Sequence, residues 1–317
     1  MVELSVVIPV RDEEDNIPEL SKRIVNIVSK MGLSFEVIFV TDINKDNTLE
    51  VLKLLNKNDE RIKAMKLSRG LGQHMAVIAG LDITMGKAVV IMDGDLQDYP
   101  EDIPKLYEKY KEGFDVVYGV KEKKNDSSLR NLFSKTFIKI LNKLSDYKID
   151  FNTCMFRILS RRTVEGILSF GEREINMTGL ISIVNFPTTE IIVTSGKRTA
   201  GETKYSFFRQ VNMALSFLLS FSTKPLRIAS GLGFTISSLS FIYLIIVAIQ
   251  KVFFNVVVLG WATIISLITF SSGIQLFFLG IIGEYIGKIF METKNRPRYF
   301  IEEKIGFDKL NVPKLLD

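Results

Sequence analysis

The sequence predicts an α/β protein with a mostly parallel sheet covered by helices, followed by a hydrophobic hairpin that crosses a membrane twice. Short apolar runs alternate with helical segments before residue 205, as is typical of parallel sheets. Polar clusters follow several of these runs directly. Residues 228–249 and 256–282 contain no charged side chain, and each segment is long enough to cross a hydrocarbon core of ~30 Å.

The predicted strands are short runs rich in aliphatic side chains, and the predicted helices carry apolar side chains at helical spacing. The strands cover residues 4–10, 35–40, 62–67, 88–92, 114–119, 156–159 and 190–194. The helices cover residues 17–31, 51–55, 100–110, 130–144 and 163–170, with one more that follows the cluster 69–74 and continues through Met85. This alternation predicts helices on both faces of the sheet.

Four polar clusters follow predicted strands, at residues 9–13, 41–42, 69–74 and 93–98. Ligands of such sheets bind outside the carboxyl ends of the strands. We therefore expect the four clusters to meet at one edge of the sheet. A meeting of four clusters is a stronger indication of a binding site than any cluster alone.

The cluster that follows residues 88–92 is the most informative, because Asp93, Asp95 and Gln97 come at alternating positions. Alternating residues of an extended chain point to one side, so these three side chains are predicted to present oxygen atoms together. Oxygen ligands of this kind suit Mg²⁺ or Mn²⁺ that is also held by substrate phosphates. The alternative is a surface turn, in which Asp and Gly are ordinary residues.

Composition narrows the class of protein. Hydrophobic residues make up 47% of the 317 residues, and the formal net charge is +5. A basic protein can bind nucleic acid or an anionic membrane. The basic residues here flank the hydrophobic segments, which favours a lipid bilayer partner and no nucleic acid. Cys154 is the single cysteine, which excludes an intramolecular disulfide, and the first residues lack the pattern of a signal peptide.

Charge also predicts the membrane topology. Lys224 and Arg227 precede the first apolar segment, basic residues follow the second, and Lys251 is the one charge between them. The positive-inside bias then places both termini in the cytosol, as expected for a multi-pass protein of the cell inner membrane. The predicted divisions are a cytosolic sheet domain at residues 1–205, an interfacial helix at 206–227, the hairpin at 228–282 and a cytosolic tail at 283–317. A buried helix is the alternative for residues 206–227.

Seven short motifs carry a resemblance that spans nearly the whole chain, at residues 6–10, 93–98, 156–157, 201–206, 224–227, 283–288 and 296–300. With them the chain resembles a family 2 glycosyltransferase of the polyprenyl-phosphate type, a class that includes dolichol-phosphate mannosyltransferase. The segments 72–74 and 154–155 resemble most closely the bacterial undecaprenyl-phosphate 4-deoxy-4-formamido-L-arabinose transferases. The resemblance implies a GT-A (Rossmann-like) catalytic domain over residues 1–205.

The resemblance also implies an activity. It is the inverting, metal-dependent transfer of a sugar from a nucleotide-sugar to undecaprenyl or dolichyl phosphate at the cytosolic membrane face, with Mg²⁺ or Mn²⁺ as cofactor. The product would be a lipid-linked sugar for a cell-envelope glycan or for lipid modification. A homotetramer is expected on the same basis.

Family motifs assign expected roles by position. The metal is expected on Asp93, Asp95 and Gln97. The expected catalytic residues are Asp93, Asp95, Arg130, Arg198 and Lys204. The expected substrate-binding residues are Pro9, Glu13, Asp42, Gly72, His74, Asp93, Lys121 and Arg157.

Several of these roles have ordinary alternatives. Lys121 and Arg130 are equally compatible with solvated surface charges. His74 is compatible with a packing role near the start of a helix. Arg198 and Lys204 suit a phosphate of either the donor or the lipid.

Two departures from the family pattern affect the predicted site. Thr41 and Asp42 stand where the family usually has paired aspartates, and Ile43 and Asn44 stand in place of Gly-Ser. Met155 stands where many members have an aspartate that is often considered catalytic. A lipid phosphate is already anionic near neutral pH, so the reaction needs orientation and cations more than proton removal.

Three other classes remain as alternatives. A processive polysaccharide synthase is disfavoured, because no Gln-x-x-Arg-Trp motif precedes Trp261. A noncatalytic protein with this fold would explain Thr41 and Met155 but not the retained acidic cluster. A nucleotidyltransferase would not need two membrane segments.

Overall fold

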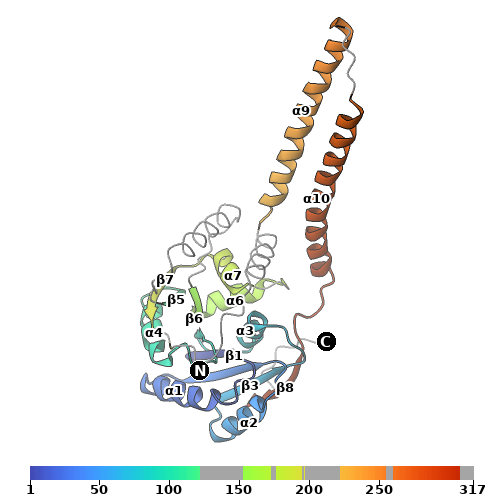
Figure 1. Ribbon diagram of the computed structural model, residues 1–317. Helices are drawn as coiled ribbons and strands as arrows, with labels where there is room; N and C mark the ends of the chain where they lie inside the picture. The colour runs from blue at the N-terminus through green and yellow to red at the C-terminus, as the bar shows by residue number, and fades with distance from the viewer. Residues whose placement is uncertain (122–152, 173–175, 195, 197–221, 255–259, 308–317) are drawn as a thin grey trace. The chain divides into compact units, whose positions relative to one another are not determined.

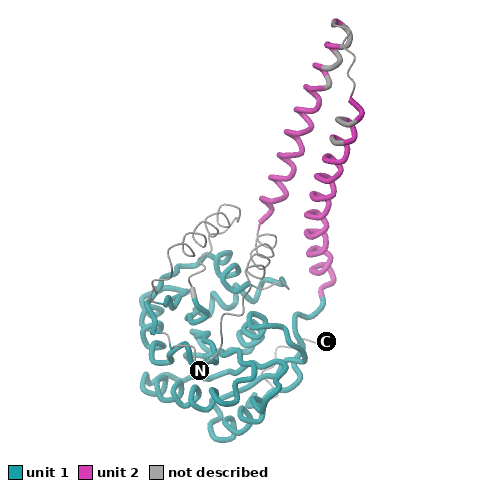
Figure 2. The backbone as a smooth tube through the Cα atoms, in the orientation of Figure 1, with its two compact units in different colours: residues 1–134, 148–204, 296–317 teal, residues 135–147, 205–295 magenta. Residues whose placement is uncertain are grey.

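The computed structural model describes residues 1–121, 153–172, 176–194, 196, 222–254 and 260–307. These residues form two compact units (Figure 2). The first contains the described residues before 197 together with 296–307, and the second contains residues 222–254 and 260–295. The predicted helix at 130–144 and the predicted interfacial helix up to residue 221 lie outside the described residues.

The first unit is built on an eight-stranded sheet in the order β7-β5-β6-β4-β1-β2-β3-β8 (Figure 1). Strands β1, β2, β3 and β4 are mutually parallel, whereas β6 runs antiparallel to β4 and β5, and β8 runs antiparallel to β3. The predicted mostly parallel α/β sheet is therefore confirmed. The strands are β1 (Leu4–Val10), β2 (Phe35–Thr41), β3 (Ile62–Leu67), β4 (Ala88–Ile91), β5 (Val116–Lys121), β6 (Thr153–Ser160), β7 (Thr188–Val193) and β8 (Ile301–Ile305).

The helices of the first unit cover both faces of the sheet. The segment predicted at 100–110 divides into a short 3₁₀ turn and α4, because Pro100 and Pro104 restrict the backbone at each start. The elements are α1 (Ile17–Lys30), α2 (Thr48–Asn58), α3 (Gln73–Asp82), η1 (Pro100–Asp102), α4 (Ile103–Lys111), α6 (Arg161–Ser169) and α7 (Met177–Val184). Helix α7 and strand β8 were not predicted from the sequence.

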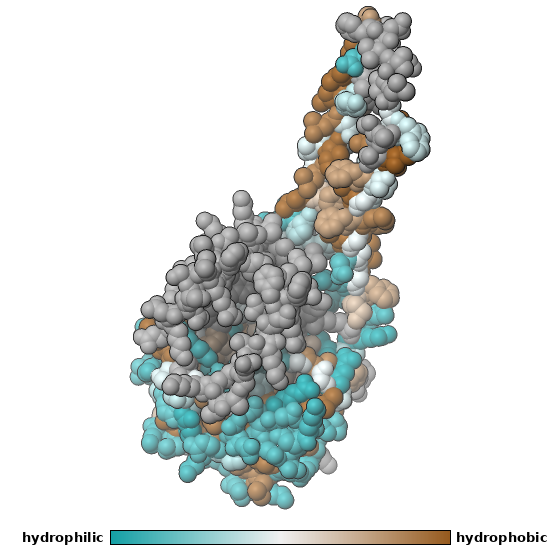
Figure 3. Space-filling model, viewed as in Figure 1, coloured by the Kyte–Doolittle hydropathy of each residue, from teal (hydrophilic) through white to brown (hydrophobic). Residues whose placement is uncertain are grey.

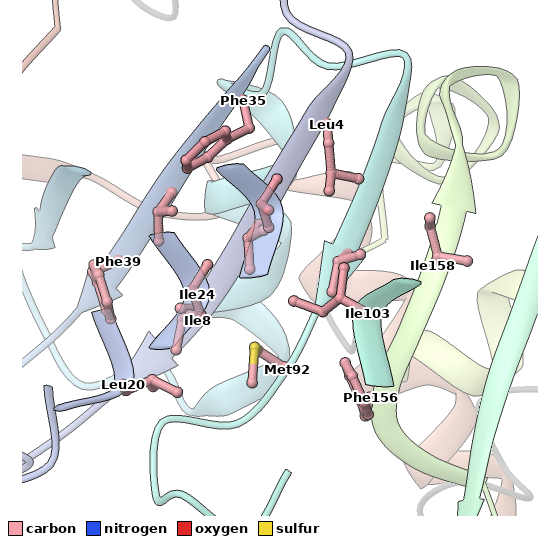
Figure 4. Close-up of a cluster of buried hydrophobic side chains, with 14 of the residues drawn as sticks. Leu4, Ile8, Leu20, Ile24, Phe35, Phe39, Met92, Ile103, Phe156 and Ile158 are labelled. Atoms are coloured by element: carbon pink, nitrogen blue, oxygen red, sulfur yellow. The ribbon is translucent and has the colours of Figure 1, made fainter. Parts of the chain in front are cut away.

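A large apolar cluster lies between the sheet and the layer formed by α1 and α4 (Figure 4). Leu4 and Ile8 alternate along β1 and face this layer, where Ile24 of α1 is fully buried with them. Burial of each such side chain contributes about 1.5–3 kcal/mol to folding. A core of this size holds β1 and β4 in fixed register, which fixes the residues that follow them.

Helix α3 covers the other face of the same strands. A Cβ atom built on Gly80 would lie 2.5 Å from Val7 Cγ1 and 3.0 Å from Val40 Cγ2. Glycine is therefore needed for the helix to approach β1 and β2 this closely. This close packing fixes α3, whose first residues face the carboxyl edge of the sheet.

Strand β8 comes from the segment after the hydrophobic hairpin. The amide of Ser68 donates to the carbonyl of Phe300 at 2.9 Å, and the Tyr299 hydroxyl donates to Asp82 Oδ2 at 2.6 Å. Lys66 of β3 and Glu302 of β8 form an ion pair at 2.6 Å. The sequence predicted a tail over 283–317, whereas residues 296–307 complete the edge of the sheet.

The second unit contains two long helices, α9 (Lys224–Phe254) and α10 (Trp261–Thr293). Both contain a segment long and apolar enough to cross a membrane, at Lys224–Tyr243 and Leu267–Thr293. Figure 3 shows hydrophobic residues along these helices, and side chains such as Phe234, Phe241 and Leu276 are exposed. Exposed apolar surface of this extent is typical of a membrane-associated protein. The predicted segment 228–249 lies within α9, and α10 begins five residues after the predicted start at 256.

Candidate active site

The carboxyl ends of β4, β1 and β2, together with the neighbouring part of the antiparallel strand β6, bring the predicted site residues to one edge of the sheet. The order β6-β4-β1-β2 places Arg157 of β6 on one side and Asp42, after β2, on the other. Asp93 follows β4 and Glu13 follows β1, between them. Three strand spacings of about 4.8 Å separate β6 from β2, a span of about 14 Å.

Two loops interlock at the end of β1 and β2. Asp12 has a positive φ of 56°, which turns the chain so that its amide donates to Asn44 Oδ1 at 3.4 Å. In return, the amide of Lys45 donates to Asp12 Oδ1 at 2.6 Å. The amide of Glu13 donates to Thr48 Oγ1 at 3.0 Å. Burial, and secondly the charge of Asp95, raise the pKa of Glu13, so Glu13 lies near the acidic cluster.

Asp42 and Asn44 leave one polar atom each without a hydrogen bond. The Thr41 hydroxyl donates to Asn44 Oδ1 at 2.8 Å, which turns the Asn44 Nδ2 donor away from Thr41. Asn44 Nδ2 and Asp42 Oδ1 are buried and have no hydrogen-bond partner in the part of the chain described here. Arg11 Nε lies 3.8 Å from Asp42 Oδ1 as an ion pair. Thr41 and Asn44, two of the departing residues at this strand end, therefore belong to one arrangement.

The acidic loop after β4 is held by its own side chains. The Gln97 side-chain amide donates to Asp95 Oδ2 at 2.7 Å, and the amide of Asp93 donates to Asp98 Oδ2 at 3.1 Å. Gln73 Nε2 donates to Asp93 Oδ1. Burial, followed by the charges of Asp98 and Asp95, raises the pKa of Asp93 to about 7. The carboxylates therefore repel one another in the absence of a cation.

This donor set fits a divalent cation shared with a substrate. Within the described ranges, no three His, Cys, Asp or Glu side chains could hold a metal by themselves. Asp93, Asp95 and the Gln97 side-chain oxygen supply two carboxylates and one amide oxygen, which leaves positions for phosphate and water. Mg²⁺ commonly takes one or two carboxylates together with substrate phosphates. The observation that favours this fit is the raised pKa of Asp93, which is caused first by burial and then by the neighbouring carboxylates of Asp98 and Asp95.

Arg157 is 1% exposed and lies opposite Ile91 of β4 and Tyr118 of β5. Its Nε donates to the carbonyl of Met155 at 3.1 Å, and its Nη2 donates to the carbonyl of Cys154 at 2.7 Å. The guanidinium lies 5.1 Å from the centre of the Tyr118 ring. Nη1 is buried without a partner among the described residues. Burying a guanidinium with an unused hydrogen-bond donor costs folding free energy unless a ligand accepts a hydrogen bond from that donor.

His74 lies in the first turn of α3, after Gly72, whose φ of 83° requires glycine. Its Nδ1 is buried and lacks a partner in the described part of the chain. Burial, and secondly the charge of Arg157, lower the pKa of His74. His74 and Arg157 are therefore near each other. Lys121, another predicted residue, lies 4.0 Å from Asp98 Oδ1.

The unpartnered polar atoms of the described residues are concentrated at this edge. Five buried side-chain nitrogen or oxygen atoms lack a hydrogen bond, and four of them belong to Asp42, Asn44, His74 and Arg157. The fifth belongs to Ser21 in α1. Buried polar groups are normally satisfied, so this concentration indicates a site for a polar ligand.

Sequence reasoning found part of this site. Pro9, Glu13, Asp42, Gly72, His74, Asp93, Asp95, Gln97, Lys121 and Arg157 lie at or beside the edge, whereas Arg130, Arg198 and Lys204 lie outside the described residues. Gln73, Asn44 and Asp98 were not assigned to the site. The signal for Gln73 was its position after Gly72, where a helix that begins at the strand edge would aim its first side chains at the site.

Comparison with known proteins identifies the family. Residues 5–168 match Glycosyl transferase family 2, and residues 224–289 match the GtrB C-terminal hairpin. The chain belongs to glycosyl transferase family 2. The predicted GT-A fold and glycosyltransferase activity are thereby confirmed.

Relatives of this family 2 glycosyltransferase extend over its whole length. It is 36% identical over 304 residues to a bactoprenol glucosyl transferase of Shigella phage SfX, which covers 96% of this chain and 100% of that protein. It is 36% identical over 315 residues to the uncharacterized glycosyltransferase sll0501 of Synechocystis sp., with 99% of each chain covered. A solved structure, glucosyl-3-phosphoglycerate synthase from Mycobacterium tuberculosis with Mn²⁺ and UDP, has a TM-score of 0.49 at 18% identity and covers 68% of this chain and 78% of its own.

Proposed function

We propose that this enzyme transfers a sugar from a nucleotide-sugar to a polyprenyl phosphate and inverts the configuration at the anomeric carbon. The acceptor class is supported by the relatives named bactoprenol glucosyl transferase, which match nearly end to end. The observation that carries the donor assignment is the row of unpartnered polar atoms at the carboxyl edge of the sheet. Asp42 and Asn44 lie at one end of the row, and Arg157 and His74 lie at the other. The acidic loop lies between these two pairs.

The donor would lie along this edge. Asp42 Oδ1 is an acceptor and Asn44 Nδ2 is a donor, a combination that suits an N–H and carbonyl on the edge of a nucleobase. Glu13, beside Pro9 at the end of β1, is suited to the ribose side. Arg157 and His74 would then face the sugar, on the far side of the acidic loop.

The diphosphate belongs at the acidic loop, where Asp93, Asp95 and Gln97 would hold Mg²⁺ or Mn²⁺ against it. A bound divalent cation offsets the negative charge that develops on the departing nucleoside diphosphate. Gln73 holds Asp93 in place from the start of α3. Lys121, which pairs with Asp98, adds a cation beside the diphosphate.

The acceptor phosphate is its own nucleophile. One of its oxygens forms a bond to the anomeric carbon while the bond from that carbon to the diphosphate oxygen breaks, so no proton has to be removed. Met155 in place of an acid is compatible with this reaction. Arg130, Arg198 and Lys204 are proposed to hold phosphates of the lipid or the donor.

The membrane topology is proposed to place the catalytic domain and both termini in the cytosol. Strand β8 belongs to the same sheet as β1, although the hairpin separates them in sequence. A folded domain stays on one side of a bilayer, so the hairpin must enter and leave from that side. The basic residues near its two ends favour the cytosolic side. The proposed divisions remain those at residues 1–205, 206–227, 228–282 and 283–317, except that residues 296–307 of the last division join the sheet of the first. A homotetramer remains the proposed assembly.

Labelling tests the topology. A cysteine placed at Lys251 in a Cys154→Ser background should react with an impermeant maleimide added from outside. A cysteine placed at the exposed Glu50 should react only after the membrane is opened. Labelling of position 251 only from the cytosolic side would contradict the proposed hairpin.

The identity of the sugar is a narrower question. The named relatives support the polyprenyl-phosphate class but give no support to the 4-deoxy-4-formamido-L-arabinose type. They also do not favour a noncatalytic or processive protein. The direct test is to incubate the purified enzyme and undecaprenyl phosphate with UDP-glucose, UDP-galactose, GDP-mannose and the formamido-arabinose donor, and to read lipid products by mass spectrometry. One sugar per lipid is expected, and absence of any lipid-linked product would overturn the proposed function.

A further inference from the structure

Arg157 has one side-chain nitrogen, Nη1, that is buried without a hydrogen-bond partner among the described residues. Phe156 and Ile158 face the large apolar cluster, so Met155 and Arg157 both face the opposite side of β6. An aspartate at position 155 would lie on the same face and could pair with the guanidinium. Methionine offers only a weak contact, with its sulfur 3.9 Å from Arg157 Nη2. With no partner among the described residues, Nη1 keeps its hydrogen-bonding capacity for a ligand.

His74 offers a complementary atom. The lowered pKa means that the imidazole is neutral near pH 7. A neutral imidazole has one N–H donor and one nitrogen acceptor. Nδ1 is the nitrogen buried without a partner among the described residues, and in the tautomer that carries its proton on Nε2 this atom accepts a hydrogen bond.

We propose that Arg157 Nη1 and His74 Nδ1 together bind one hydroxyl group of the transferred sugar, and that this pair determines which sugars the enzyme accepts. A hydroxyl group accepts a hydrogen bond from the guanidinium and donates its own proton to the imidazole, so both buried atoms are satisfied. A phosphate oxygen can only accept, so it would satisfy Arg157 Nη1 but not the Nδ1 acceptor of the Nε2-protonated tautomer of His74. The proposal rests on the proposed transfer from a nucleotide-sugar.

The energetic consequence is discrimination against sugars that lack this hydroxyl. Such a donor would leave both buried atoms unpaired, and a site built around a hydroxyl rejects an analogue without it strongly. We expect one monodeoxy analogue of the preferred donor to lose at least about 50-fold in kcat/KM, because two hydrogen bonds are lost. The other monodeoxy analogues should lose less.

The test compares wild type with His74→Leu and His74→Asn. The donor is whichever of UDP-glucose, UDP-galactose and GDP-mannose the wild type transfers best, with its monodeoxy analogues. His74→Leu should have a lower kcat/KM for the intact donor. The ratio of kcat/KM for the intact donor to kcat/KM for the discriminated analogue should fall to about 3-fold or less in this variant. His74→Asn should recover part of that ratio, because its side-chain oxygen can occupy the position of Nδ1. Affinity for the nucleoside diphosphate alone should stay unchanged, since it lacks the sugar.

Two controls separate the outcomes. Ser21→Ala removes the unpartnered buried hydroxyl of α1 and should leave the discrimination ratio unchanged. Arg157→Lys keeps the charge and should reduce discrimination, with folding checked by thermal denaturation and nucleoside diphosphate affinity. Persistence of the full ratio in His74→Leu, or an equal loss of nucleoside diphosphate affinity, would overturn the assignment to a sugar hydroxyl. Absence of transfer from every donor by wild type would instead overturn the proposed function, and the inference with it.

Discussion

The two edges of the sheet both carry buried polar groups, but in the described part of the chain only the carboxyl edge leaves such groups without hydrogen-bond partners. At the amino edge, the Glu36 carboxylate is 2% exposed and accepts from Ser5 Oγ and the Met85 amide at 2.7 Å. Lys63 completes it with an ion pair at 2.8 Å. At the carboxyl edge, Asp42 and Arg157 are as deeply buried and keep unpartnered atoms. A satisfied buried charge supports the fold, whereas an unsatisfied one indicates a ligand.

The largest expected effect comes from the acidic loop at the carboxyl edge. Asp95→Asn removes one charge from the proposed metal ligands and should lower kcat by about 10³-fold, as expected when a group that stabilises developing charge is lost. Circular dichroism and the thermal midpoint should remain close to wild type. Activity within a few-fold of wild type would remove Asp95 from the reaction, and Glu108→Gln on the solvent side of α4 serves as a charge-matched control.

Substitution of the buried carboxylate at the amino edge should lower the stability of the protein and leave its substrate specificity unchanged. Glu36→Ala leaves the Ser5 hydroxyl, the Met85 amide and Lys63 without their partner, and should destabilise the protein by about 3 kcal/mol. Urea titration monitored by circular dichroism measures this loss of stability. KM for the nucleotide-sugar should be unchanged in the folded fraction. A changed KM with unchanged stability would contradict the distinction between the two edges.

A smaller effect is expected at the base end of the donor. Asn44→Asp replaces the unpartnered Nδ2 donor by an acceptor beside Asp42, and should weaken UDP binding by about 10-fold through one lost hydrogen bond and added repulsion. Isothermal titration with UDP measures the change. Asn47→Asp, at an exposed position of the same loop, adds the same charge and should have little effect. Equal effects of both substitutions would indicate that only net charge matters.

The smallest effect concerns a second satisfied carboxylate at the amino edge. Hydrogen bonds from Arg162, and then from Ser160, lower the pKa of Asp115 despite its burial. A lowered folded-state pKa means that the carboxylate stabilises the protein above its unfolded value of about 3.9, and that this contribution is lost as pH falls through the folded value. Asp115→Asn should therefore be less stable than wild type near pH 7, and the two thermal midpoints should converge in acid. A constant difference from pH 7 down to pH 2.5 would argue against this assignment.

The sequence predicted the sheet well because its strands are locally encoded. The run at residues 62–67 matches β3, and the acidic cluster follows β4 as expected. Strand β8 escaped prediction because Glu302, Glu303 and Lys304 give it a charged, short pattern, and its partner β3 lies more than two hundred residues earlier. Only tertiary pairing makes this segment a strand.

The details of the site depended on contacts that no local pattern contains. In the sequence, Thr41 and Asn44 are only departures from the family pattern, whereas in the structure the Thr41 hydroxyl donates to the Asn44 side-chain oxygen and so orients its amide. Gln73 reaches Asp93 only because α3 packs closely on the sheet at Gly80. Residue types at strand ends therefore indicated where the site lies, whereas its unpartnered atoms required the folded structure.

The position of β8 has a consequence for the order in which the protein is made. Ribosomes synthesise the chain from its amino end, so β3 exists long before β8, with both apolar helices made in between. Until β8 arrives, the backbone groups along one side of β3 have no strand partner, and an open edge of this kind favours aggregation. The sheet can close only after the hairpin has left the ribosome. Completion of the sheet is thus timed by the synthesis of the two apolar helices that precede β8.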